Sequence, residues 1–391
     1  MRIRAILPVL VLVLAAGCDG SITGPSFLHL KALTLAPTFS CGIDGAGHTY
    51  CWGSDNGSGQ LGTGDNAPSD MPLRVKSSVR FTQVVTGRSH ACALSEEGRA
   101  FCWGDNSQSQ LGVTAADLSC ELLQPSGWTQ DFGNACSTLP VPVETTLRFT
   151  KLGAADDRTC GLTSGGRLWC WGSGALGDSA GVSVSDTLVQ VSLSAKLTTF
   201  ALGQFHTCAA DTDGLGWCWG GNANGSLGLG VVAGTIGLAG TPMRINSSAF
   251  LKAFAMGASH TCALTSAGEA LCWGFGQSGQ RGDSSTVATQ QDPTFAKTAR
   301  RFSAIVAASN STCALERGTG TPYCWGENSG GSLGDGTTSD LVVPTRVLGD
   351  LTFSALAMRA AGYPYATTTC GVTADQVYCW GLLPQPLTFG E

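Results

Sequence analysis

The chain has 391 residues, 54 of them glycine; 13% of its residues carry a charge, and the formal net charge is −6. This composition is typical of short strands joined by glycine-rich turns, whereas long amphipathic helices need more Glu, Lys and Arg. A mildly acidic chain without a Lys/Arg cluster argues against a surface for nucleic acid.

The N-terminus has the pattern of an export signal. Arg2 and Arg4 precede the short apolar stretch 5–16, which ends in Leu14-Ala15-Ala16-Gly17-Cys18. This ending resembles the bacterial lipoprotein signal, in which the cysteine becomes the lipidated first residue. Ala15 stands where that signal usually has Leu, and a plain secretory signal is the alternative.

The lipoprotein interpretation fixes the expected organisation and location. We expect a signal at residues 1–18 that ends at the lipidated Cys18, a short linker at 19–27, and one domain at 28–391. The protein would then be exported, held to a bacterial membrane by its lipid, and face the periplasm or the cell exterior. Beyond the N-terminus, no apolar run is long enough to span a bilayer.

A phrase that ends in Cys-Trp-Gly occurs seven times, each time with a second cysteine nine to eleven residues earlier. In the copy that starts at Cys92, the two cysteines become cross-strand partners of a hairpin if Ser95 faces Arg99. The loop between them then ends at Gly98, where glycine suits the left-handed conformation. Opposed residues of this kind lie about 4.5 Å apart at their Cα atoms, which is within disulfide reach.

Export permits disulfides, and the spacings differ from those of zinc sites. Free buried thiols are the alternative. With Cys18 assigned to the lipid, the other sixteen cysteines form eight predicted disulfides: Cys41–Cys51, Cys92–Cys102, Cys120–Cys136, Cys160–Cys170, Cys208–Cys218, Cys262–Cys272, Cys313–Cys324 and Cys370–Cys379.

Each hairpin is predicted to belong to a four-stranded unit. An apolar strand precedes the hairpin, as at 81–85 in the second unit. After the hairpin come a turn-rich stretch and then a Pro-led strand, as at 72–75 in the first unit. Units of about 50 residues with four strands have the size of propeller blades. Seven such units fill residues 28–391, and the last ends in a shortened strand at 384–389.

The repeat resembles that of the regulator of chromosome condensation family. The resemblance implies an all-β fold, a seven-bladed β-propeller, and here an exported bacterial member whose hairpins are stapled by disulfides. It is carried in the second unit by Gly87, His90, Ala93, Leu94, Gly98, Trp103, Gly104, Asn106, Leu111 and Gly112.

Few residues suggest catalysis or metal binding. His90, His206 and His260 occupy one repeat position, where neighbouring-blade backbone groups are the expected partners and a metal is the alternative. The stretch Asp211–Gly214 resembles the start of a calcium loop but lacks the later ligands. The tryptophans of the Cys-Trp-Gly phrases recur once per unit, which predicts blade packing. We therefore expect no catalytic residue, metal or cofactor.

A long insertion is the strongest candidate for partner binding. The spacing between units is 68 residues at this point and about 51 elsewhere, so the stretch 113–140 holds about 17 extra residues. Its Trp128, Gln130, Asp131 and Phe132 lie outside any repeat position, and rigid loops with such side chains form interface hot spots. Alternatively, Trp128 covers the side of a blade.

Three functions are compatible with these observations. The first is a non-enzymatic, monomeric scaffold anchored at the cell envelope, which binds a protein partner through the loops of one propeller face. The second, implied by the family resemblance, is guanine-nucleotide exchange on a small GTPase. The third is an extracytoplasmic enzyme or inhibitor with its site at the mouth of the central channel.

Overall fold

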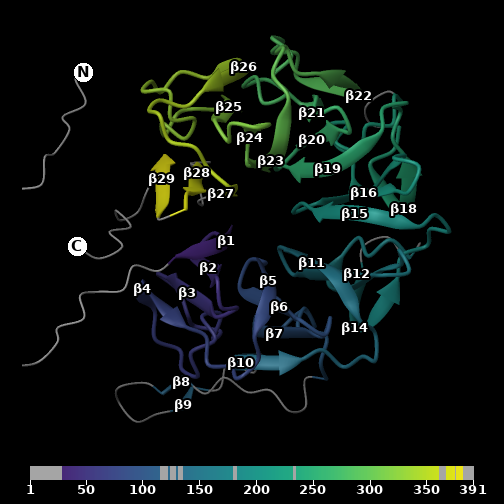
Figure 1. Ribbon diagram of the computed structural model, residues 1–391. Coiled ribbons are helices and arrows are strands. Elements are labelled where there is room, and N and C mark those ends of the chain that lie inside the picture. The colour runs from purple at the N-terminus through teal and green to yellow at the C-terminus, as the bar shows by residue number, and fades with distance from the viewer. Residues whose placement is uncertain are drawn as a thin grey trace, which may run out of the picture.

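The computed structural model describes residues 29–114, 122–123, 129–130, 135–178, 183–231, 235–360, 367–374 and 376–381. Every element assigned within these ranges is a β-strand, and the strands form sheets arranged in a ring (Figure 1). The predicted signal, the linker 19–27 and the last predicted strand lie outside the described residues. No helix in the described part of the chain is long and apolar enough to cross a membrane.

The strands fall into seven blades. Blade 1 contains β1 (Leu30–Leu35), β2 (Phe39–Asp44), β3 (Thr49–Gly53) and β4 (Ser69–Arg74). Blade 2 contains β5 (Phe81–Thr86), β6 (His90–Ser95), β7 (Ala100–Asp105) and β10 (Cys136–Pro142). Blade 3 contains β11 (Phe149–Ala155), β12 (Arg158–Thr163), β13 (Leu168–Gly174) and β14 (Ser183–Gln190). Blade 4 contains β15 (Leu197–Leu202), β16 (His206–Asp211), β17 (Gly216–Gly221) and β18 (Leu238–Arg244).

Blade 5 contains β19 (Leu251–Met256), β20 (His260–Thr265), β21 (Ala270–Phe275) and β22 (Thr289–Phe295). Blade 6 contains β23 (Phe302–Ala308), β24 (Ser311–Glu316), β25 (Pro322–Gly326) and β26 (Leu341–Arg346). In blade 7 the described strands are β27 (Ala355–Ala360), β28 (Thr367–Val372) and β29 (Val377–Gly381). A short pair, β8 (Leu122–Leu123) and β9 (Thr129–Gln130), belongs to the insertion.

The predicted all-β, seven-bladed propeller is confirmed. Consecutive strands pair in antiparallel fashion within each blade, from the innermost strand to the outermost. The first strand of each blade lies nearest the centre of the ring, and β27 of the last blade lies beside β1 of the first (Figure 1). Neighbouring inner strands contact one another around the whole ring.

The hairpins are stapled as predicted. Cys92 lies opposite Cys102 in the register of β6 and β7, and all seven described cross-strand pairs have Cα atoms 4.0–4.2 Å apart. These seven predicted disulfides are therefore confirmed. Cys136 is also disulfide-bonded; its predicted partner Cys120 lies outside the described residues.

The predicted hairpin turns are also confirmed. The Ser95 backbone N–H donates to the Arg99 carbonyl at 2.9 Å, which closes the loop at the predicted pair. Gly98 has a φ of 76°, a conformation that glycine adopts without steric cost. The equivalent glycines in five other blades have φ between 71° and 86° (Gly47, Gly166, Gly214, Gly268 and Gly320). Asp375, at this position in blade 7, is outside the described residues.

The outer strands begin earlier than predicted. The prediction placed Pro72 at the start of its strand, whereas β4 already begins at Ser69. The register between β3 and β4 shifts between the pairs Cys51–Leu73 and Gly53–Ser69, so Pro72 lies in a bulge. Proline has no N–H to donate and is tolerated at bulges and on edge strands, and β4 is the outer edge of its blade.

The core lies between the blades. Trp103 and Leu61 are fully buried, and the Trp103 indole N–H donates to the Gln60 carbonyl of the preceding blade at 3.0 Å. Phe81 at the start of the inner strand packs against Trp103, with ring centroids 6.4 Å apart. The recurring tryptophans therefore serve blade packing, as their spacing indicates.

Candidate functional site

The two faces of the ring are built from different connections. Short turns such as 87–89 connect the first strand of a blade to the second, and long loops such as 54–68 connect the third strand to the outer strand. Both kinds of connection lie at the same end of the blade. We call this end the loop face. The hairpin turns, such as 96–98, and the residues just before each inner strand form the opposite end, the hairpin face.

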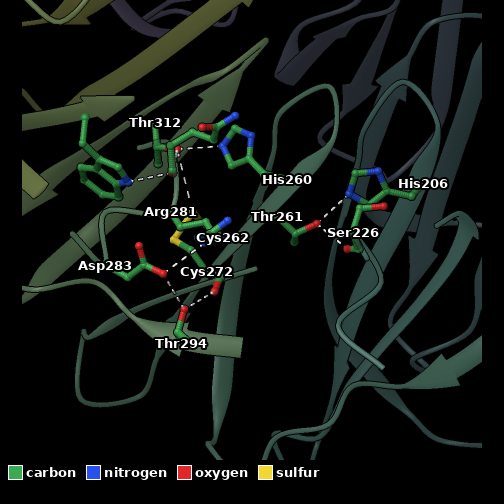
Figure 2. The surroundings of a disulfide bond; sticks show 12 residues. His206, Ser226, His260, Thr261, Cys262, Cys272, Arg281, Asp283, Thr294 and Thr312 are labelled. Carbon is green, nitrogen blue, oxygen red and sulfur yellow. Dashed lines mark hydrogen bonds and ion pairs between the residues drawn. A yellow bond between two sulfur atoms is a disulfide. The ribbon is translucent and has the colours of Figure 1, made fainter. Parts of the chain in front are cut away.

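The three histidines of one repeat position lie in three separate blade interfaces. His260 Nε2 lies 2.9 Å from the hydroxyl of Thr312 in the next blade, and that hydroxyl donates to the Gln280 carbonyl. Figure 2 shows the same arrangement for His206 and Thr261. His90 and Thr159 form the third pair. The predicted position of the partner in the neighbouring blade is correct, but the partner is a threonine hydroxyl instead of a backbone group.

Each of these histidines is held in its neutral form. Because the threonine hydroxyl donates its hydrogen to a carbonyl, it accepts from the histidine, which therefore carries its ring proton on Nε2. Burial lowers the pKa of His90, His206 and His260 to about 3. Among the described residues, no three His, Cys, Asp or Glu side chains are arranged to hold a metal ion. The geometry gives these histidines a structural role.

The stretch that resembles a calcium loop has its carboxylate engaged in a hairpin turn. Asp211 is buried, and its Oδ1 accepts from the backbone N–H groups of Asp213 and Leu215. Its Oδ2 accepts from the Trp217 indole at 3.0 Å. Asp44 occupies the same place in blade 1 and accepts from two backbone N–H groups of its own turn.

Four of the long loops on the loop face are each held from inside by one buried asparagine. In blade 1 the buried Asn56 accepts from the Leu61 N–H at 2.9 Å and donates to the carbonyls of Asp65 and Ala67. Buried asparagines accept in the same way in three other blades (Asn106, Asn222 and Asn328). The loop tips are thus held in place by side chains that the solvent does not reach.

Acidic side chains gather on the loop face where blades 2 and 3 meet. Arg88 forms an ion pair of 2.7 Å with Asp156, and its backbone N–H donates to the Asp156 carbonyl. The neighbouring Asp157 is half-buried. Burial raises the pKa of Asp157, and the nearby Asp156 and Asp105 carboxylates raise it further, against the lowering effect of Arg88.

The insertion leaves the propeller at this acidic group. Cys136, the first residue of β10, lies opposite Asp105, and the Asn106 N–H donates to the Ala135 carbonyl at 2.7 Å. Gln130 lies in β9, paired with Leu122. The other proposed partner-binding residues (Trp128, Asp131 and Phe132) lie outside the described residues, so their role stays a prediction.

The two faces carry opposite charge. Carboxylates on the loop face that are exposed or half-buried are Asp55, Asp65, Asp105, Asp156, Asp157, Asp178, Asp283, Glu327, Asp335 and Asp340. The exposed cation in the described parts of these loops is Arg88, and the buried Arg281 is paired with Asp283. Exposed cations on the hairpin face are Lys31, Arg80, Arg99, Arg148, Lys196, Lys252, Arg300, Arg301 and Arg317. The carboxylates on this face that are exposed or half-buried are fewer than its exposed cations: Asp44, Glu96, Glu97, Asp213, Glu269, Glu316 and Asp350.

This polarity was not predicted from the sequence. The sequence shows no Lys/Arg cluster because blades 1 to 6 each contribute only one to three of these cations, about 50 residues from the next group. Aligning the repeats by their cysteines would have placed Arg80, Arg148, Lys196 and Arg301 one residue before the inner strand of their blades. That alignment is the signal that could have revealed the basic face.

Comparisons with known proteins agree with this architecture. One model of the regulator of chromosome condensation (RCC1) repeat matches residues 46–94 and 213–264, and a second model of that repeat matches 81–110, 149–177 and 251–280. The mitochondrial RCC1 domain-containing protein RUG3 of Arabidopsis thaliana is 28% identical over 39% of this chain, which spans only 32% of that relative. The ultraviolet-B receptor UVR8 of the same plant is 27% identical over 82% of this chain and 72% of the receptor.

A solved structure extends the likeness to most of the ring. Prp20p of Saccharomyces cerevisiae, described together with its binding to Gsp1p and histones, superimposes with a TM-score of 0.69 over 90% of this chain and 83% of Prp20p. Its sequence identity to this chain is 18%, so the likeness shows the fold alone. Guanine-nucleotide exchange by the 391-residue chain described here stays a prediction from the family resemblance.

Proposed function

We propose that this chain, a seven-bladed propeller built from regulator of chromosome condensation repeats, is an envelope-anchored, non-enzymatic scaffold that binds a protein partner. The proposed site is the loop face at blades 2 and 3, where the insertion leaves the ring. The observation that carries the proposal is the acidic group of Asp105, Asp156 and Asp157 at the base of that insertion.

Rigidity supports a binding role. Asn106 fixes the loop that precedes the insertion, and the buried Cys92–Cys102 disulfide staples the strands on which it stands. A binding surface that is ordered before its partner arrives avoids the entropy cost of ordering side chains and loops on association. A partner can therefore bind without any rearrangement of the propeller itself.

The disulfides support an extracytoplasmic location. The structure has seven described disulfides, and in six of them both cysteines are buried. Disulfides persist in an oxidising compartment and are rare in the cytosol. Lipidation of Cys18 would then hold the propeller at a membrane. In this arrangement the scaffold presents its loops to proteins of the cell envelope.

The test of this function is loss of partner binding at the insertion. The full chain is used to capture partners from envelope extract by cross-linking, and the affinity of the recovered partner is measured for Trp128→Ala and Asp157→Asn. We expect Trp128→Ala to weaken binding by about 2 kcal/mol or more, as for an interface hot spot. The matched control is Glu96→Gln, which removes one exposed carboxylate from the opposite face.

Thermal melting separates binding from folding. The proposal requires an unchanged melting temperature in Trp128→Ala and unchanged affinity in Glu96→Gln. If Trp128→Ala lowers the melting temperature and leaves the affinity intact, then Trp128 covers a blade and the assignment of the site is wrong. Equal weakening by Asp157→Asn and Glu96→Gln would place the partner elsewhere.

A further inference from the structure

We propose that the hairpin face docks on the anionic lipid headgroups of the membrane that carries the protein's anchor. The proposal rests on the lipid anchor of the proposed function and adds an orientation to it: hairpin face toward the bilayer, loop face away from it. Three observations support it, namely the placement of cations, an exposed apolar side chain among them, and the point at which the chain enters the ring.

Four of the nine cations occupy the same repeat position, in blades 2, 3, 4 and 6. Arg80, Arg148, Lys196 and Arg301 each stand directly before an inner strand, and all four are exposed. Arg301 is paired with Glu269 at 3.0 Å. In the described part of the chain, the other three have no carboxylate within ion-pair distance. Arg80 instead donates weakly to a backbone carbonyl, so its charge stays available to an anion.

The centre of this face is basic as well. Lys31 and Lys252 are exposed second residues of the inner strands β1 and β19, so they stand at the mouth of the ring. Lys31 donates to the Gly45 carbonyl, which holds its ammonium at the hairpin face. The cations therefore extend over blades 1 to 6 and do not lie on one edge.

An apolar side chain favours a bilayer over other polyanions. Phe250 fills the position of the ring cations in blade 5 and is 47% exposed. In blade 7, Leu351 lies two residues before Phe353 and is 40% exposed. Aromatic and aliphatic side chains surrounded by Lys and Arg are typical of proteins that lie on a membrane interface.

The chain enters the propeller at this face. Leu30, the first residue of β1, is paired with Asp44 at a hairpin turn. Eleven residues separate Leu30 from Cys18, and a chain of that length spans at most about 40 Å even when fully extended. An anchor attached so closely to the hairpin face favours contact of that face with the headgroups.

Charge fixes the orientation. Each Lys or Arg near an anionic surface strengthens binding about fivefold, the equivalent of about 1 kcal/mol, and salt screens the effect. The loop face carries mainly carboxylates, so the same surface repels it. The docked protein would therefore leave the candidate partner site at blades 2 and 3 open to the compartment.

The experiment measures binding to vesicles without the anchor. Cys18→Ser in the full chain is sedimented with phosphatidylcholine vesicles that contain or lack phosphatidylglycerol. The test variant adds Arg80→Gln, Arg148→Gln and Lys196→Gln. The control instead adds Gln204→Glu, Ala223→Glu and Gln277→Glu, which lowers the net charge by the same amount on exposed loop-face residues.

We expect binding only to the anionic vesicles, at least a tenfold loss in the test variant, and little change in the control. Lys31→Gln with Lys252→Gln is the second variant if the first melts at a lower temperature. Equal losses in test and control, binding that ignores phosphatidylglycerol, or binding to heparin without binding to vesicles would each overturn the proposal. The vesicle experiment uses a chain without the lipid anchor and adds no partner. Its outcome therefore does not bear on partner binding, which the affinity measurements test separately.

Discussion

Single threonines join neighbouring blades, which makes Thr159 a site of predictable energetic cost. Its hydroxyl accepts from His90 Nε2 at 2.8 Å and donates to the Gln110 carbonyl at 2.9 Å. Thr159→Val leaves the buried His90 N–H without a partner. We expect a loss of about 1–3 kcal/mol in the free energy of unfolding, measured by urea denaturation.

The chain contains a matched control for this prediction. Thr207 occupies the same repeat position in the next blade, and its buried hydroxyl has no hydrogen-bond partner among the described residues. Thr207→Val should therefore change the free energy of unfolding by much less. Similar losses in the two variants would mean that the shared valine packing, and not the histidine contact, sets the cost.

At the residue scale, the sequence predicted the positions of the histidines but not their threonine partners. The repeat register placed His90, His206 and His260 at equivalent positions, and the structure agrees. Their partners are 52 to 69 residues away, in a different repeat, so local pattern analysis did not find them. Comparing each repeat with the following one would have shown threonine recurring one residue after the histidine position.

At the scale of one element, the disulfide of a hairpin should stabilise the whole blade. Cys92 and Cys102 are fully buried and close a ring of about 11 residues. On the loop-entropy model such a ring contributes about 2–3 kcal/mol, and the hydrogen-bonded turn lowers that figure because it already holds the strand ends together. We expect Cys92→Ala with Cys102→Ala to lose about 1–3 kcal/mol in urea denaturation.

A loss near zero would show that the hairpin hydrogen bonds alone hold the strands together. A loss well above 5 kcal/mol would show that the variant leaves a cavity in the interface with blade 3, where Thr159 Oγ1 lies 3.8 Å from Cys92 Sγ. Both outcomes contradict the stated origin of the stabilisation.

Hairpins were the elements that the sequence predicted best. Cys92, Gly98 and Cys102 lie at fixed offsets, and those offsets determine the pairing, the turn and the disulfide together. The outer strands were predicted less well. Pro72 looked like a strand start because proline often begins a strand, but the bulge at that point lets the strand begin at Ser69 and continue through the proline.

For the whole molecule, the seam between the first and last blades should be the least protected part of the ring. All the strands of blade 1 come from consecutive residues, and no described disulfide joins two blades. At the seam, β27 packs beside β1, and Arg359 donates to the Pro37 carbonyl over a long 3.4 Å. Local opening begins where the fewest bonds must break.

Hydrogen exchange tests this prediction. Amides in β1 and β27 should exchange faster than those in β15 and β19, which lie in the middle of the chain and contact each other in the same way. Equal or slower exchange at the seam would contradict it. The prediction concerns rates within one sample, so it needs no variant.

The number of blades followed from the sequence, whereas the polarity of the faces did not. Seven similar cysteine phrases predicted seven blades. The opposite charge of the two faces depends on which end of a strand each loop occupies, and a net charge of −6 averages over both ends. The partner-binding role of Trp128 rests on composition alone, because the insertion has no repeat to compare it with.

The order of the cysteines has a consequence for biogenesis. Each of the seven described disulfides joins a cysteine to the next cysteine along the chain, from Cys41–Cys51 to Cys370–Cys379. A chain that crosses a membrane from its N-terminus therefore presents each native pair in turn. An oxidase that links cysteines as they emerge makes these native bonds directly, so their formation requires no later thiol–disulfide reshuffling.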